Sequence, residues 1–186
     1  MKGYVYINKT REYLDYLEEH FNNVFSAFNL FNSKLNKLND KGSVEEKDKY
    51  KVLLDFLSNE KQYESFVKEV INHDISKFSE NEFVQYRKYF HPINNKEKKE
   101  SEDLFEKAWE HHQKVNSHHW QNRVGGKYDS GEKITMVLHN VIDWVAMSYK
   151  FKEPIDKYYN KKKKELDMSD EDFILIELVF DLLKTD

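Results

Sequence analysis

The side chains best suited to chemistry in this sequence are imidazoles and carboxylates. The chain contains no cysteine, so a thiolate nucleophile and thiolate metal ligands are excluded. Histidines and aspartates recur along much of the chain, and the candidate metal ligands are His20, His73, Asp74, His112, His118, His119 and Asp143. Imidazole and carboxylate together suit a borderline divalent or trivalent cation. The pattern therefore predicts a metal site.

These candidates interrupt apolar stretches of the sequence. Asp143 lies between Ile142 and Trp144, and Asp74 follows Val70 by four residues, which is about one helical turn. An isolated buried aspartate has a large desolvation cost, and buried carboxylates are usually paired or bound to a metal. We therefore expect the candidates to point inward and to hold a cation.

Each candidate has an ordinary explanation when it is taken singly. His20 could be a hydrogen-bonded core histidine, Asp74 could cap a helix end, and Asp143 could pair with a buried basic side chain. The pair His118-His119 could belong to a loop that packs on the bundle. The metal interpretation rests on the conjunction, because separate predicted helices each offer an inward-pointing side chain of the ligand type.

The order of a histidine, a His-Asp pair and a later aspartate resembles the HD superfamily of metal-dependent phosphohydrolases. The segment HFNNV at 20–24 is similar to the first-histidine helix of that family, and HDISK at 73–77 resembles its HDxxK element, which reads HDxGK in the HD-GYP branch. More closely, the chain resembles a group of uncharacterised phage and bacterial HD-like proteins. The matching motifs are HDISKF at 73–78, AWEHH at 108–112, NSHHW at 116–120 and DWVAMS at 143–148.

The resemblance implies an α-helical fold with the metal site in the middle of the bundle. It implies that His20, His73, Asp74 and Asp143 hold a first metal and that Asp74 can bridge to a second. His112 and one or both of His118 and His119 have the positions of the further histidines in two-metal members. The implied cofactor is one or two divalent transition-metal ions, namely Mn, Fe, Co, Ni or Zn, with Mg as a further possibility.

Three other histidines compete for roles. His111 is an alternative to His112, since adjacent side chains on a helix point about 100° apart, and the spacing to Asn116 favours His112. His139 lies one helical turn before Asp143, and we interpret it as a partner of the ligands rather than as a ligand. His91 has no evident partner and is predicted to be a surface residue.

The function expected from the site and the resemblance is hydrolysis of a phosphomonoester or phosphodiester in a small phosphorylated substrate, a nucleotide or cyclic nucleotide. Asp74 is the candidate for orienting the attacking water, and Lys77 is the candidate for holding a phosphate oxygen as a point charge. Arg87 and Arg123 are further possible phosphate binders. Two alternatives remain open: a di-iron HD-like oxygenase, and a non-catalytic protein that binds a nucleotide or a partner.

The elements that must position these residues are predicted to be helices, because apolar residues recur at helical spacing and only 2 prolines and 5 glycines interrupt the chain. Helices are expected at about 11–38, through 53–71, at 96–114 and at 132–149, with a polar loop over 116–131. Ser79 and Glu82 predict a capping box for a short helix that ends near His91, and Ser169 with Asp172 predicts a cap for the last helix.

The bulk composition predicts one all-α domain over residues 1–186, with a core at about 11–150 and a C-terminal helical extension at about 151–186. The net charge of −4 excludes a polybasic nucleic-acid arm, and we expect no nucleic-acid partner. No apolar run is long enough to cross a bilayer, which predicts a cytoplasmic protein without a membrane partner. A homo-oligomer is possible, because the last helix could pack on its own bundle or on a second subunit.

Overall fold

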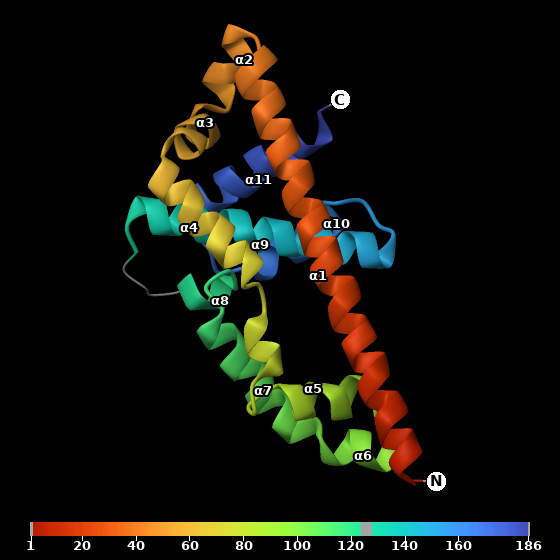
Figure 1. Cartoon of the computed structure of the whole chain (residues 1–186). Helices are drawn as coiled ribbons and strands as arrows, with labels where there is room; N and C mark the ends of the chain where they lie inside the picture. Colours follow the sequence, from red (N-terminus) through yellow and green to blue (C-terminus); the bar gives the residue numbers. More distant parts are fainter. Residues whose placement is uncertain (1, 124–127, 186) are drawn as a thin grey trace.

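The computed structural model describes residues 2–123 and 128–185, and within that range the secondary structure is entirely helical. The first helix, α1 (Lys2–Lys41), is longer than predicted and runs the length of the molecule (Figure 1). It ends where Gly42 passes close to Leu38, since a Cβ at Gly42 would lie 2.5 Å from the carbonyl oxygen of Leu38. A residue other than glycine would therefore displace the backbone at this turn.

The region after α1 forms three helices rather than one. These are α2 (Val44–Lys49), α3 (Lys51–Ser58) and α4 (Glu60–Ile71). Ser43 and Glu46 form a capping box that starts α2, and the side chain of Asn59 accepts a hydrogen bond from the backbone N–H of Gln62 to start α4. Side-chain caps therefore start α2 and α4, whereas the break at Tyr50 between α2 and α3 has no side-chain cap.

The segment between α4 and α9 comprises the 3₁₀ helix η1 (Ile75–Phe78), α5 (Phe83–Phe90), α6 (Asn95–Glu100), α7 (Glu102–Val115) and α8 (Trp120–Arg123). It reaches the N-terminal end of α1 at α5 and α6 and returns toward α9 through α7 and α8 (Figure 1). The predicted helix at 96–114 is thus interrupted at Ser101, and the predicted loop at 116–131 contains α8. The expected capping box is wrong: Ser79 ends η1, and the carboxylate of Glu82 contacts histidines of α7 instead.

The central helix α9 (Ser130–Phe151) crosses α1 and packs against it, against α4 and against the last helix (Figure 1). After α9 come α10 (Lys157–Lys162), the 3₁₀ helix η2 (Lys163–Glu165) and α11 (Asp170–Lys184). Ser169 accepts a hydrogen bond from the backbone N–H of Asp172, which confirms the predicted cap. Because α11 packs on α9 and α1, the predicted C-terminal extension contributes to the core of a single compact helical domain.

Two hydrophobic clusters meet along α1. The larger cluster includes Val24 and extends over α3, α4, α9 and α11. The smaller one joins Leu17 of α1 to Tyr86 of α5 and Ala108 of α7. His20 lies between Leu17 and Val24, so the polar site occupies the boundary between the two clusters. Among the described residues, no helix is both long and apolar enough to span a membrane.

Candidate metal centre

The first side chain of the site comes from α1. His20 lies on the face that α1 turns toward α9, and it is 2% exposed. Its Nε2 atom lies 2.9 Å from Nε2 of His73. The ring of Tyr16, one turn earlier, is nearly parallel to the His20 ring. The apolar periodicity of α1 therefore brings one imidazole into the interior at a defined height along the helix.

The pair His73-Asp74 lies in the turn that follows α4. Asp74 has a φ of 53°, in the left-handed region that an aspartate adopts at a modest energetic cost. His73 and Asp74 are 4% and 2% exposed. This turn orients both neighbouring side chains into the interior, whereas successive residues of a regular helix would point about 100° apart.

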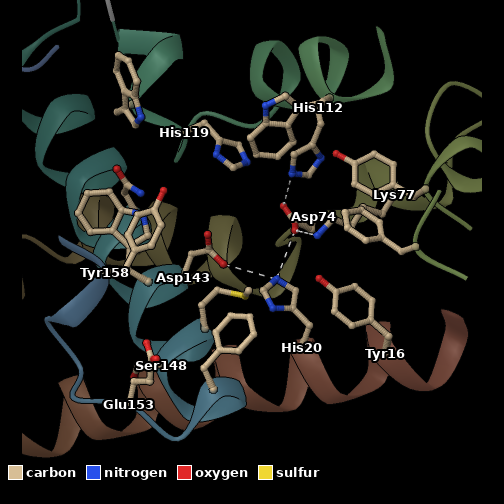
Figure 2. A pocket seen from close by; sticks show the side chains of 18 of the residues that line it. Tyr16, His20, Asp74, Lys77, His112, His119, Asp143, Ser148, Glu153 and Tyr158 are labelled. Carbon is tan, nitrogen blue, oxygen red and sulfur yellow. Dashed lines mark ion pairs between the residues drawn. The ribbon is translucent and has the colours of Figure 1, made fainter. Parts of the chain in front are cut away.

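The first group of potential ligands contains His20, His73, Asp74 and Asp143. Nε2 of His20 lies 3.4 Å from Oδ2 of Asp74 and 3.5 Å from Oδ1 of Asp143. The corresponding distances from Nε2 of His73 are 3.3 and 3.6 Å. Three loci of the fold, α1, the turn after α4 and α9, thus bring ligand atoms of His20, His73 and Asp143 within 4.8 Å of one another, and Oδ2 of Asp74 lies beside both imidazoles. Figure 2 shows His20, Asp74 and Asp143 pointing toward one another. This spacing fits the first shell of a small cation.

The second group contains Asp74 together with three imidazoles. The other carboxylate oxygen, Oδ1, lies 3.2 Å from Nε2 of His112 and 3.4 Å from Nε2 of His118. His119 completes the group, in which one ligand atom from each residue lies within 4.8 Å of those of the others. The two oxygens of Asp74 therefore face different groups, as a bridging carboxylate would.

Two buried side chains, His139 and Glu82, contact the second ring nitrogen of a candidate ligand. Nε2 of His139 lies 2.9 Å from Nδ1 of His73, so His139 contacts the ring nitrogen that faces away from the first group. Oε2 of Glu82 lies 2.8 Å from Nδ1 of His112, and its Oε1 lies 2.8 Å from Nδ1 of His111. Contacts of this kind fix the orientation and tautomer of a ligating imidazole. The role of Glu82 was missed in the sequence, where its spacing from Ser79 indicated a cap.

Burial and charge set the protonation of the site. Burial lowers the pKa of His20 and of His119, the latter to about 4, so both rings are neutral at pH 7. Burial also lowers the pKa of His112, but Asp74 and Glu82 outweigh it and raise the pKa to about 9. Burial raises the pKa of Asp74, but His73, Lys77 and His112 bring it well below its usual value. The interior thus contains an ionised carboxylate among mostly neutral imidazoles.

Lys77 is buried, with 6% of its surface exposed, and its Nζ lies 2.5 Å from Oδ2 of Asp74. Burial lowers the pKa of its ammonium group, but Asp74 more than compensates and raises the pKa above the usual value. Lys77 is therefore a charged partner of Asp74 at the edge of the first group. Its burial excludes the alternative that Lys77 is an ordinary exposed lysine. It also lines the cavity described below.

The described residues fit a metal ion. Nε2 of His119 is buried and has no hydrogen-bond partner among the described residues, although a buried ring nitrogen normally has one. It belongs to the second group with Asp74. Lowered pKa values leave His20, His118 and His119 neutral and Asp74 ionised, which is the form in which these groups bind a cation, whereas His112 would release its proton on binding one. A further combination of His73, His118 and His139 overlaps these groups.

A cavity of about 690 Å³ opens onto the site. His20, Asp74, Lys77, His112, His119 and Asp143 line one part of it, and Figure 2 shows these side chains converging from several helices. Other parts of the wall are aromatic and include all three tryptophans of the chain, Trp109, Trp120 and Trp144. A volume of this size is typical of small-ligand sites.

Some residues singled out in the sequence lie outside the two groups. Both guanidinium nitrogens Nη1 and Nη2 of buried Arg87 bind the carboxylate of Glu97, at 2.9 and 3.1 Å, so the suggestion that Arg87 binds phosphate is wrong. His91 is half-buried, with Nδ1 3.5 Å from Glu12, which corrects the expectation of a surface residue without a partner. His111 contacts Glu82, as above. The side chain of Arg123 lies outside the described residues.

Comparison with known proteins gives a family but no activity. A family described as "Family of unknown function (DUF5662)" matches residues 9–181. No curated protein and no solved structure matches the chain. The match covers every candidate ligand, from His20 to Asp143, together with most of α11.

Proposed function

The chain belongs to DUF5662, a family of unknown function, and from the site we propose that it is a metal-dependent phosphohydrolase or phosphodiesterase of the HD type that acts on a nucleotide or cyclic nucleotide. The observation that carries the proposal is the position of Asp74. One of its oxygens lies within 3.4 Å of His20 and His73, and the other within 3.4 Å of His112 and His118. A carboxylate shared in this way is suited to hold two cations side by side.

His20, His73 and Asp143 would hold the first ion together with Oδ2 of Asp74, which lies within 3.4 Å of both imidazoles. Asp74 with His112, His118 and His119 would hold the second. Such ions neutralise the charge of a phosphate ester and lower the pKa of water, so that hydroxide is present near neutral pH.

The protein's own groups supply orientation and charge. The carboxylate of Asp74 can accept a hydrogen bond from the attacking water and thereby orient it. The ammonium group of Lys77 lines the cavity beside Asp74, where it can bind a phosphate oxygen as a point charge. Glu82 and His139 keep His112 and His73 in their orientations.

The test combines metal content with turnover. Purified protein is analysed for bound metals and then screened with mono-, cyclic and dinucleotides in the presence of Mn²⁺. We expect phosphate or phosphomonoester release by the wild type. Asp74→Ala should lose both metal and activity, since it removes a ligand from both groups, and His112→Ala should lower the metal count. Glu110→Ala, at an exposed position of the same helix, is the control and should retain both. A wild type that cleaves none of these esters with any metal contradicts the proposal.

One observation favours a second candidate, an iron-dependent oxygenase. The second group offers several imidazoles and one carboxylate, and two histidines with one carboxylate are a ligand set used by non-haem Fe(II) oxygenases. Oxygen uptake by Fe(II)-loaded protein, measured alongside the esterase screen, separates the two functions. Uptake without ester cleavage would make the oxygenase the better assignment.

A further inference from the structure

Four of the eight exposed aromatic side chains in the described part of the chain line the cavity. Large apolar residues that are more than a third exposed include Phe90, Trp109, Phe151 and Tyr158, and all four line it. Single exposed apolar residues are ordinary, but a group of them around one concave surface marks a binding site. The four rings at the cavity therefore make it a candidate binding surface.

Phe151 and Tyr158 form the part of this wall that the proposed chemistry does not use. Phe151 is the last residue of α9 and is 59% exposed, and Tyr158 is in α10 and is 46% exposed. The ring of Tyr158 lies 5.7 Å from that of buried Trp144. In Figure 2, Tyr158 and Lys77 lie on opposite sides of the two aspartates. When the phosphate of a ligand lies at Lys77, the opposite end of that ligand can therefore contact the rings of Phe151 and Tyr158.

The chemistry of the wall selects a class of ligand. Aromatic faces attract planar rings by stacking and by burial of apolar surface, and stacking accepts any base because every base has a π-face. A sugar phosphate has no such ring, so the aromatic side chains would stay exposed to water when it binds. The cavity is large enough for a mononucleotide-sized ligand.

We propose that the aromatic wall at Phe151 and Tyr158 is a ring-binding subsite, so that the site takes phosphoesters that carry a planar aromatic ring and rejects sugar phosphates. This inference rests on the proposed function for the position of the phosphate. It adds that the ring, rather than the sugar or a particular base-edge pattern, decides which phosphoester is bound.

The test is calorimetric titration with adenosine 5′-monophosphate and ribose 5-phosphate, which carry the same phosphomonoester and differ by the ring. Each is titrated into metal-free protein in chelator and into Mn²⁺-loaded protein. We expect the ring-bearing ligand to bind roughly ten-fold tighter or more, as one stacked base provides. Tyr158→Ala and Phe151→Ala should each reduce the ratio several-fold, and Tyr158→Phe should retain it. Phe25→Ala, which removes an exposed aromatic ring of α1 outside the cavity, is the control.

Equal affinities for the two ligands, or binding of neither, would overturn the proposal, as would a preference that survives both alanine variants. Sedimentation velocity adds a further outcome: if neither ligand binds and Tyr158→Ala weakens self-association, the wall is an interface between copies. Failure of the hydrolase assignment is distinguishable. If the protein prefers the ring-bearing ligand but hydrolyses neither ester, the hydrolase assignment is wrong and the ring-binding subsite stands. If it hydrolyses both esters equally well, the ring-binding subsite is wrong and the hydrolase assignment stands.

Discussion

At the scale of single residues, Lys77 separates catalysis from metal binding. Its Nζ lies 2.5 Å from Asp74, yet a protonated ammonium group cannot ligate a metal. Lys77→Met, which keeps an unbranched side chain one atom shorter and removes the charge, should lower kcat for a phosphoester by roughly a hundred-fold, the effect of losing one group that stabilises developing charge. Metal content, measured by elemental analysis, should stay at the wild-type level.

The matched control for this change is Lys107→Met, which alters an exposed lysine of α7 and should leave both quantities unchanged. Loss of metal together with activity in Lys77→Met would show that Lys77 acts by holding Asp74 in place. Full activity on every ester that the wild type cleaves would remove Lys77 from the mechanism.

His139 tests whether the second layer of contacts supports the ligands. It is buried, and its Nε2 lies 2.9 Å from Nδ1 of His73. His139→Leu removes this hydrogen bond and should weaken metal binding by about 10–100-fold, whereas His139→Gln keeps a hydrogen-bonding group and should weaken it less. Competition titration with a chromophoric chelator measures the affinity. Equal affinities in wild type and His139→Leu would reduce His139 to a packing residue.

At the scale of elements, the ion pair between Arg87 and Glu97 joins α5 to α6. Their side chains are 7% and 12% exposed, and Glu97 also accepts a hydrogen bond from the backbone N–H of Ile93. Breaking a buried pair leaves an uncompensated charge, which costs about 3–5 kcal/mol. Glu97→Gln should therefore lower the free energy of unfolding by about 3 kcal/mol at pH 7, as measured by urea denaturation. Glu100→Gln, at an exposed site on the same helix, should have little effect.

The stability that this pair contributes should depend on pH. Burial raises the pKa of Glu97, but the hydrogen bonds from Arg87 and Ile93 bring it below the usual value of 4.5. A carboxylate with a lowered folded-state pKa stabilises the protein above its unfolded pKa and loses that contribution as pH falls through the folded one. The difference in unfolding free energy between wild type and Glu97→Gln should thus be full at pH 7 and shrink below about pH 4.5. A difference that is constant over this range would contradict the assignment.

At the scale of the whole molecule, α11 belongs to the same core as the helices that carry the site. Ile176 is fully buried in the larger cluster, whereas Ile174, two residues earlier, is 66% exposed. Ile176→Ala should lower the free energy of unfolding by about 2–5 kcal/mol, in a single transition that includes the site helices. Ile174→Ala should change it by less than about 0.5 kcal/mol. Denaturation followed by both circular dichroism and tryptophan fluorescence measures this, and separate transitions would show that α11 is an independent unit.

Local patterns in the sequence were sufficient to predict the helical class, the helix at 132–149 and the cap at Ser169. Helical periodicity and capping depend on residues three or four positions apart, so a short segment of sequence is sufficient to predict them. The same periodicity indicated that His20 and Asp143 point inward. It could not locate the breaks at Tyr50, Asn59 and Ser101, because apolar spacing continues through them.

The partners of each polar side chain were decided only by the tertiary structure. Glu82 binds the histidines of α7 rather than capping α5, Arg87 is neutralised by Glu97, and Lys77 is buried against Asp74. The division of the two Asp74 oxygens between two groups arises from a left-handed turn set against α1, α7 and α9. A hydrogen bond or ion pair forms between groups that the packing of distant helices brings within about 3 Å of each other. The number of residues between two side chains in the sequence does not determine this distance in space.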